Sequence, residues 1–444
     1  MALRIADEHP LATKMIVIGL ITLGLMIPLS MLRGLIQERS QMRNQAVDTV
    51  ANGWGGNLTA GGPIVRVPFE IARKSDKGEI TMEAHQMYVL ADELSIKASL
   101  EHSATRRVGI YGVPVYLVHV KIDGNFKMTD ILDAAARSFY PSGIFHWDNA
   151  RICLPLSDVR SIRELTLPTI AGRSLIFGPA LTNGYPGVEP GIEAKIDLSQ
   201  FAKDATLPFS MESLLAGSQS MSLLPTAATT QVTLRAGWPD PQFDGAFLPA
   251  HYSIDAHGFN ADWHVLALNR AFSQSWVDTE VDIAKLNAAA FGVGLFQSVD
   301  VYQRSERAVK YALLFIALTF LSFFAWEVLG QLRVHAVQYV FIGLALSTFY
   351  LLLIALTEHL PFWLSYWLGA AALVALLGIY IAGVMDSAKR GMIIAFVMTL
   401  VYGLLYMLVL SESYSLLIGA IALFGVLATV MLATRKFRWE TVAS

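Results

Sequence analysis

The chain has 444 residues, of which 54% are hydrophobic and 16% are charged, and its formal net charge is −3 at pH 7. Soluble domains are typically about 45–50% apolar and about 25% charged, so this composition excludes an ordinary soluble protein. The nearly neutral balance gives no reason to expect nucleic acid as a partner. The single cysteine, Cys153, excludes an intramolecular disulfide, and we expect it to be a small buried residue.

The chain begins with a polar segment, residues 1–14, and an uncharged apolar run follows at residues 15–32. Such a run suits either a signal peptide or a membrane-spanning helix. It is long for the apolar part of a signal peptide, and no small-residue cleavage pattern follows before Arg33. We therefore interpret 15–32 as an uncleaved signal anchor and 1–14 as a cytoplasmic tail.

Residues 33–308 differ in composition from the rest, because they hold 24 Lys or Arg and 29 Asp or Glu. Helical spacing continues from the anchor over residues 35–50, and a series of glycines then ends it. The region is long enough to bury a core of its own. We predict that 33–308 form a separate domain on the outer side of the membrane.

The pattern within this domain is mainly that of β-strands. Hydrophobic and polar residues alternate at 94–101 and 118–123, which is typical of half-buried strands. Asp123 and Gly124 predict a hairpin turn, and Thr129 is the predicted N-cap of a helix over 129–139. Short apolar segments punctuated by Pro and Gly follow at 152–156, 175–177, 192–198 and 231–236. Together these features favour a sandwich-like domain with few helices.

Residues 309–433 hold only eight charged side chains and consist of five apolar runs. Each run is close to the roughly 20 residues that cross a bilayer as a helix, and lipid offers the backbone no other hydrogen-bond partners. The runs are 309–329, 337–356, 363–384, 391–410 and 414–433. Small residues four apart, such as Gly378 and Ala382, suit close packing between these helices.

Lys and Arg in short loops indicate which side of the membrane is cytoplasmic. They flank alternate ends of the runs and are absent from the loops at 357–362 and 411–413. The predicted inner residues are Arg4, Lys14, Arg333, Lys389, Arg390, Arg435, Lys436 and Arg438. The prediction is therefore an α-helical integral membrane protein with six transmembrane helices, both termini in the cytoplasm, and the β domain inserted between helix 1 and helix 2. Residues 434–444 form the second cytoplasmic tail.

Candidate metal ligands gather at His251, Asp255 and His257, with Asp262 and His264 close in sequence. On one strand the first three would share a face but stand in a row, so a turn would be needed to bring them to one ion. A polar sheet face and loop is the simpler interpretation. No HExxH, GxSxG, P-loop or GxGxxG pattern occurs, so we predict no catalytic residue and no cofactor.

Ionisable residues near the predicted helix ends are the remaining candidate functional positions. They are Glu38, Arg39, Arg307, Glu327, Glu358, His359 and Glu412. A transporter would usually place such groups at the middle of the bilayer, and none of the five runs has a charge there. Anchoring at the interface, or pairing between the two segments that flank the domain, is the favoured interpretation.

Short motifs along the chain are shared with a known family. They include GLIQER at 34–39, Trp54 with Gly55, Gly62 to Ile64, Trp238 with Pro239, Gly258 with Phe259, LLFIALTF at 313–320, FYLLL at 349–353 and Glu358 with His359. In these residues the chain resembles the CreD family of inner-membrane proteins over nearly its whole length. Asn57 and Ser298 depart from the expected Gln and Pro. The resemblance implies a role in envelope integrity under the control of a two-component system, and it implies no catalytic residues.

Three classes of function remain open at this point. The first is a non-enzymatic inner-membrane protein whose periplasmic domain binds an envelope component or a partner protein. The second is a transporter or flippase for a lipid-like substrate, which needs no buried charge. The third is a metal-dependent periplasmic hydrolase. The bilayer is the one partner that the sequence indicates, and the oligomeric state is left open.

Overall fold

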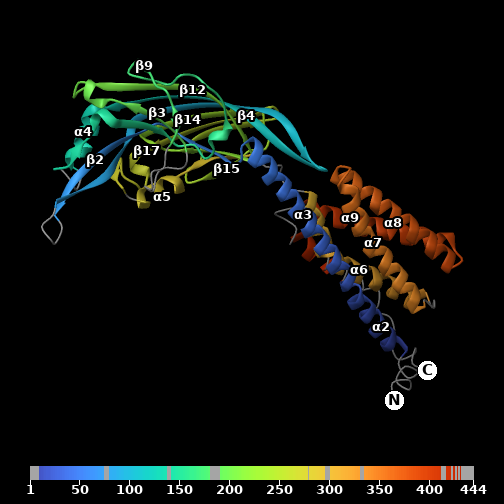
Figure 1. Ribbon diagram of the computed structural model, residues 1–444. Coiled ribbons are helices and arrows are strands. Elements are labelled where there is room, and N and C mark those ends of the chain that lie inside the picture. Colours follow the sequence, from blue (N-terminus) through green and yellow to red (C-terminus); the bar gives the residue numbers. More distant parts are fainter. Residues whose placement is uncertain are drawn as a thin grey trace. The chain divides into compact units, whose positions relative to one another are not determined.

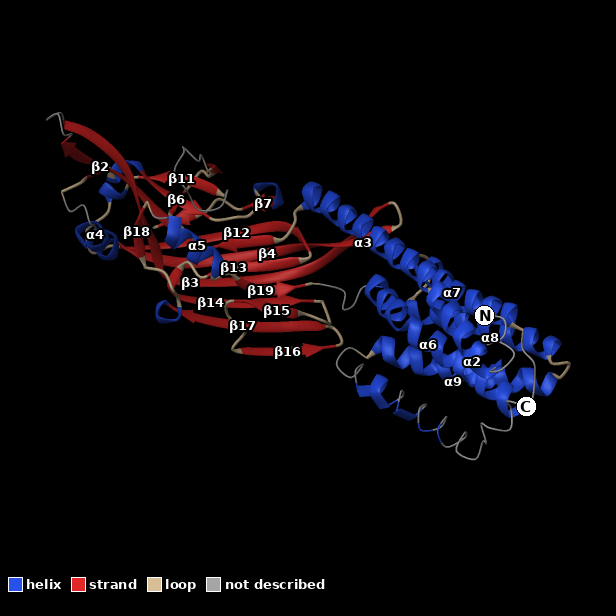
Figure 2. Cartoon of the chain, turned by 90° about the horizontal axis from the view of Figure 1, so that it is seen from below, coloured by secondary structure: helices blue, strands red, loops and turns tan. Residues whose placement is uncertain are grey.

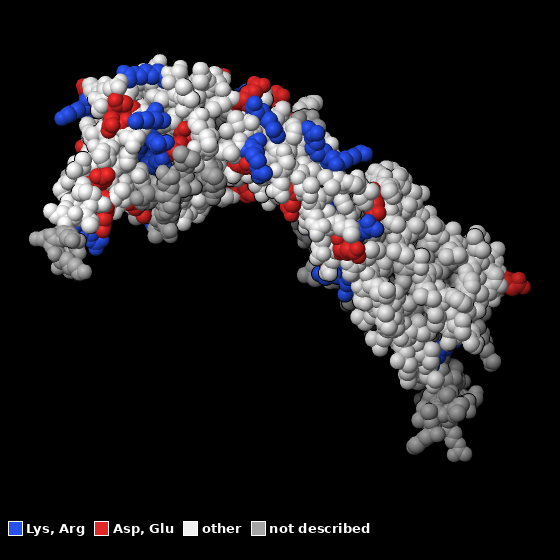
Figure 3. All heavy atoms as spheres, viewed as in Figure 1, with Lys and Arg blue, Asp and Glu red and all other residues white. Residues whose placement is uncertain are grey.

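The computed structural model describes residues 10–74, 80–137, 142–180, 191–278, 280–295, 301–330 and 335–411, together with 417–421, 424, 425, 428 and 431. Contacts divide the chain into two compact units (Figure 1). The helical unit comprises Met1–Arg43 and Val299–Ser444, and the β unit comprises Asn44–Ser298. On the face seen in Figure 3, most charged side chains lie on the β unit, whereas the surface of the helical unit is largely uncharged.

The helical unit is built from long helices that are largely apolar. They are α2 (Pro10–Gly24), α3 (Met26–Trp54), α6 (Val301–Gly330), α7 (Ala336–Thr357), α8 (Phe362–Val384) and α9 (Ala388–Leu410). One of them, α3, continues past Arg43 into the β unit. Within the described residues, five helical stretches are long and apolar enough to cross a membrane, and α2 and α3 together form the first of them. The predicted sixth span, 414–433, lies partly outside the described residues, and those of its residues that are described are helical.

Close packing between α8 and α9 depends on small residues. A Cβ on Gly391 would lie 2.6 Å from the carbonyl oxygen of Gly378 and 2.7 Å from the Cβ of Ala382. The two helices therefore approach backbone to backbone, as small residues permit in lipid. The predicted use of Gly378 and Ala382 in helix packing is confirmed.

The β unit contains one large sheet and one small sheet. The central strands of the large sheet are β3 (Ile80–Val108), β4 (Tyr111–Lys127), β12 (Thr206–Ser218), β14 (Ala227–Ala236), β17 (Gly258–Leu266) and β16 (His251–Asp255). Towards its other end lie β2 (Ile64–Lys74), β6 (Ala150–Leu154), β11 (Ile192–Ile196), β10 (Gly178–Pro179), β5 (Ile144–Phe145) and β18 (Ser275–Val277). Short strands β7 (Ile162–Leu165), β8 (Thr169–Ile170) and β9 (Arg173–Ser174) continue from β12. The small sheet has the order β1 (Leu58–Gly61), β13 (Ser220–Leu224), β19 (Phe291–Gly294) and β15 (Gln242–Gly245).

One hydrophobic core joins the two sheets. The inward residues of β3, such as Leu94 and Ile96, belong to the same buried cluster as Met221 of β13 and Val293 of β19. The predicted alternation on β3 and β4 is confirmed, because Leu94, Ile96, Val118 and Val120 are all buried while the polar residues between them face outward. Two short helices, α4 (Met128–Arg137) and α5 (Glu280–Ala288), accompany the sheets.

Three local predictions are wrong. Asp123 and Gly124 lie within β4, paired with β3 and β12, and the hairpin turn of β3 and β4 is at Gly109 and Ile110. Gly124 allows the backbones of β3 and β4 to approach closely, since a Cβ there would lie 2.8 Å from the carbonyl oxygen of Glu93. Helix α4 begins at Met128 directly after β4, so Thr129 lies inside its first turn and is not the N-cap. Residues 175–177 form no strand.

Candidate functional site

An open groove of about 670 Å³ lies on the outer face of the large sheet. Its floor is formed by β14, β3, β4 and β12, which lie side by side (Figure 1). Because side chains alternate along each strand, the face opposite the core presents the polar set that the sequence places between the buried residues. The groove lining includes Lys97, His119, Lys121, Glu164, Glu212 and Arg235.

The strand register assembles these side chains into two rows that cross the sheet. In the first row, Thr233 pairs with Lys97, Lys97 with Lys121, and Lys121 with Glu212. In the second row, Arg235 pairs with Ser99, Ser99 with His119, and His119 with Leu214. Five strands therefore converge on one surface, since Glu164 of β7 adjoins Leu214 of β12.

The groove has more positive charge than it neutralises internally. Lys121 Nζ donates to Glu212 Oε1 at 2.8 Å, and this hydrogen bond raises the pKa of Lys121. Lys97 lies directly opposite Lys121, and among the described residues it makes no ion pair. Like charges directly opposite each other across two strands destabilise a sheet. The pair Lys97 and Lys121, with Arg235 and His119 in the next row, therefore favours an anionic group from outside.

A second ionic cluster lies on the other part of the sheet and is closed rather than open. Glu193 of β11 is buried, with its side chain only 3% exposed, and its two oxygens accept from Arg66 and Arg151, each at 2.6 Å. Cys153 is the cross-strand neighbour of Glu193, and burial raises the pKa of its thiol to about 11. Burial also raises the pKa of the nearby Tyr88 to about 12. This cluster links the three strands β2, β6 and β11, and both oxygens of Glu193 are used within it.

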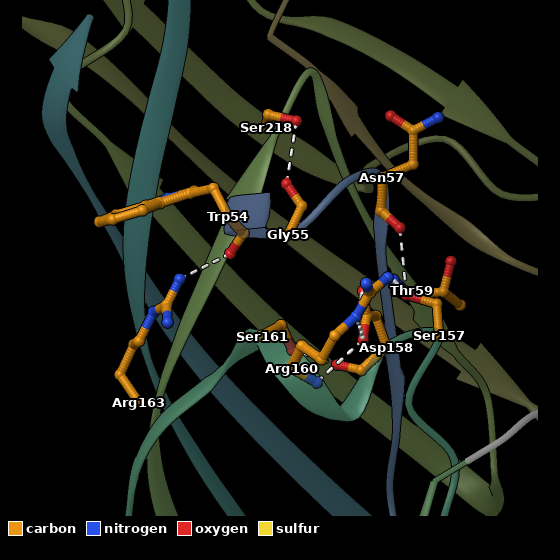
Figure 4. Close-up of polar contacts among 10 residues, drawn as sticks. All are labelled: Trp54, Gly55, Asn57, Thr59, Ser157, Asp158, Arg160, Ser161, Arg163 and Ser218. Atoms are coloured by element: carbon orange, nitrogen blue, oxygen red, sulfur yellow. Dashed lines mark hydrogen bonds and ion pairs between the residues drawn. The ribbon is translucent and has the colours of Figure 1, made fainter. Parts of the chain in front are cut away.

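The end of α3 is held to the sheet by a third group, which we call the α3 anchor and which comprises Trp54, Gly55, Arg106, Arg163 and Ser218. Figure 4 shows all of these residues except Arg106. The guanidinium groups of Arg106 and Arg163 lie 4.4 and 4.5 Å from the Trp54 ring centroid. Arg163 Nη2 donates to the Trp54 carbonyl at 2.8 Å, and Ser218 Oγ donates to the Gly55 carbonyl at 3.1 Å. Such cation–π contacts and hydrogen bonds fix the last turn of the helix.

The candidate metal ligands His251, Asp255 and His257 are not grouped around one point. His251 and Asp255 lie at opposite ends of β16, and Asp255 Oδ1 accepts from the backbone of His257 and Gly258 in the turn that follows. In the part of the chain that the structure describes, no three His, Cys, Asp or Glu side chains are grouped closely enough to hold a metal ion. The Asp255 carboxylate is used to shape the turn.

The candidate residues at helix ends fall into separate places within the helical unit. Glu327 is 6% exposed, accepts from Lys14 Nζ of α2, and accepts from the Tyr339 hydroxyl of α7 at 3.0 Å. Arg39 Nε lies 3.3 Å from Glu358 Oε1. The others are placed as follows: Glu38 and His359 are exposed, Arg307 is half-buried, and Glu412 lies outside the described residues. Glu327 thus links three helices, which the sequence does not show.

A family model and a curated relative identify the same family. The family described as "Inner membrane protein CreD" matches residues 10–440. The protein of that name from Escherichia coli strain K12 is 29% identical over 436 residues, covering 97% of this chain and 94% of its own. Among solved structures, a putative nutrient binding protein from Legionella pneumophila aligns at 9% identity over 52% of this chain and 74% of its own. Its TM-score of 0.26 is too low to support a conclusion about the fold.

Proposed function

Because the chain belongs to the CreD family of inner membrane proteins, we propose that it contributes to cell-envelope integrity by binding an anionic partner in the groove of its β unit. The partner is an envelope component or an acidic segment of another protein, and no chemical step is required. The observation that carries the proposal is the pairing of Lys97 with Lys121 on the groove floor, beside Arg235 and His119.

Binding at this site follows from general electrostatics. An exposed groove with an excess of one sign of charge raises the local concentration of ligands of the opposite sign. Here Lys97, Lys121 and Arg235 outnumber Glu164 and Glu212. A charge-assisted hydrogen bond to a carboxylate or phosphate is about twice as strong as a neutral one. Lys97 has an ammonium group available for such a bond, and Glu212 and Glu164 at one side of the groove would turn a ligand's negative end towards β14 and β3. These charges therefore give the groove affinity for an anionic ligand and a preferred orientation of that ligand.

In-cell photocrosslinking tests the proposal. We expect a photoreactive residue at Ser99, on the groove floor, to capture a partner, whereas the same residue at the exposed Thr129 of α4 captures none. Lys97→Glu should reduce the Ser99 crosslink at least fivefold, because it replaces attraction by repulsion. Lys203→Glu, on an exposed loop outside the groove, is the matched control. Equal capture from Ser99 and Thr129, or capture that survives Lys97→Glu, would contradict the proposal.

The membrane arrangement is part of the same proposal. We propose six spans with both termini in the cytoplasm and the β unit in the periplasm, supported by the loop charges and by five helical stretches of sufficient length. A periplasm-active reporter fused after residue 150 or after Glu358 should be active, and a fusion after Arg390 should be inactive. Activity that is cytoplasmic at residue 150 would overturn the topology.

A transport function is the second candidate, and one observation favours it. Ionisable residues buried among membrane helices often mark a pathway, and Glu327 is buried in the helical unit. However, Lys14 and Tyr339 already hold both of its oxygens, as in a structural pair. Flux of a labelled lipid-like substrate in proteoliposomes distinguishes the two functions: flux that Glu327→Gln abolishes would favour transport.

A further inference from the structure

The outermost strand of the large sheet, β16 (His251–Asp255), is an open edge. Among the described strands it pairs only with β17, and Figure 2 shows it as the last strand of that part of the sheet. All five of its residues are exposed. Its register with β17 is continuous and contains no bulge, and the strand has no lysine or proline. Lysine, proline and bulges commonly protect a free edge, and the only charged side chain of this five-residue strand is that of Asp255 at its end. The backbone groups of this edge are therefore open to pairing with another strand.

The two faces of β16 differ in character. Tyr252 and Ile254 point to the core side, opposite Ala261 and Phe259 of β17, and they are 62% and 46% exposed. The Tyr252 ring lies 5.3 Å from that of Phe243 in β15, the edge strand of the small sheet. The core therefore ends in aromatic and aliphatic side chains that the described residues of the β unit do not cover completely.

The sequence of β16 is complementary to itself. In an antiparallel pair of two β16 strands centred on Ser253, Tyr252 of each copy lies opposite Ile254 of the other, which is a favourable aromatic and β-branched pair. On the other face, His251 of each copy lies opposite Asp255 of the other, so an imidazole meets a carboxylate. Because the twofold axis passes through Ser253, both favourable pairs form twice.

We propose that β16 pairs antiparallel with β16 of a second copy of this chain, joining the two large sheets into one continuous sheet across a twofold axis at Ser253. Both backbone hydrogen bonds and the mutual covering of Tyr252 and Ile254 stabilise the pair. A five-residue strand makes a small interface. Two copies held in the same membrane have a high effective concentration, so a small interface suffices.

Disulfide crosslinking in membranes tests the pairing and its register. In a Cys153→Ser background, Ser253→Cys should give a disulfide-linked dimer, since directly opposed residues in an antiparallel pair have Cα atoms about 4.5–5.5 Å apart, within disulfide range. Ser99→Cys, exposed on the same sheet away from the edge, is the matched control. We expect at least tenfold more dimer from Ser253→Cys than from Ser99→Cys.

A mixed-chain experiment distinguishes this register from others. When chains carrying His251→Cys and chains carrying Asp255→Cys are expressed together, the crosslink should join one chain of each kind. His251→Cys alone should give at least fivefold less dimer. His251→Asp, introduced with Ser253→Cys, places two carboxylates opposite each other and should reduce the dimer several-fold. Dimer from Ser253→Cys no greater than from Ser99→Cys, equal crosslinking by His251→Cys alone, or a disulfide to a different protein would overturn the proposal.

Discussion

Glu193→Gln is expected to destabilise the β unit by about 3 kcal/mol, because it removes the charge that Arg66 and Arg151 share while leaving both guanidinium groups in place. Removing one partner of a buried ion pair typically costs about 3–5 kcal/mol. The Arg66 and Arg151 side chains are 20% and 34% exposed, so water relieves part of the cost and places the expectation at the lower end. The midpoint of thermal unfolding should fall by roughly 6–12 °C.

The single thiol of the chain provides a local readout for this change. Cys153 is 7% exposed and lies beside Glu193 on the adjacent strand, so a thiol reagent reaches it only when the sheet opens. A loss of about 3 kcal/mol corresponds to roughly a hundredfold faster labelling of the full-length protein in membranes. Glu83→Gln is the control, because its pair with Arg73 is exposed and contributes less than about 1 kcal/mol. Labelling of Glu193→Gln at the rate of Glu83→Gln would show that the cluster contributes no stability.

The features of the fold that could be predicted from the sequence are those that depend on a local pattern of residues. Leu94 to Leu100 alternate with polar residues, and the pleat of a strand makes that alternation a direct statement about which side is buried. Apolar runs of about 20 residues likewise predict the long helices, since length and hydropathy alone decide whether a helix can cross a bilayer. Both predictions hold because each depends only on residues that are close together in the sequence.

What depends on pairing between distant strands could not be predicted. Arg66 and Glu193 are 127 residues apart, and only the order of β2, β6 and β11 brings them together. Lys97 and Lys121 are visible as polar residues in alternating segments, but their direct opposition needs the register of β3 with β4. The false hairpin at Asp123 and Gly124 has the same origin, because a glycine required for close approach to Glu93 looks like a glycine in a turn.

Gly55→Ala is expected to destabilise the α3 anchor by about 3 kcal/mol. Gly55 has a φ of +131°, a conformation that side chains disfavour, and a Cβ there would lie 2.5 Å from the carbonyl oxygen of Ala216. The Gly55 nitrogen donates to the Ala51 carbonyl at 3.0 Å, so the residue cannot rotate without losing the hydrogen bond that ends the helix. Strained φ and overpacking each cost about 1–3 kcal/mol, and here both apply.

The adjacent glycine supplies the matched control for this prediction. A Cβ on Gly56 would meet only the Cβ of Ala51 at 3.6 Å, an ordinary contact, so Gly56→Ala should change stability by less than about 1 kcal/mol. Trypsin can report the difference on the full-length protein, because the guanidinium groups of Arg106 and Arg163 contact the Trp54 ring while the anchor is intact. Cleavage after these arginines should be much faster in Gly55→Ala than in Gly56→Ala. Equal cleavage and equal unfolding midpoints would mean that the chain can leave α3 by another path and that the Gly55 turn is not required.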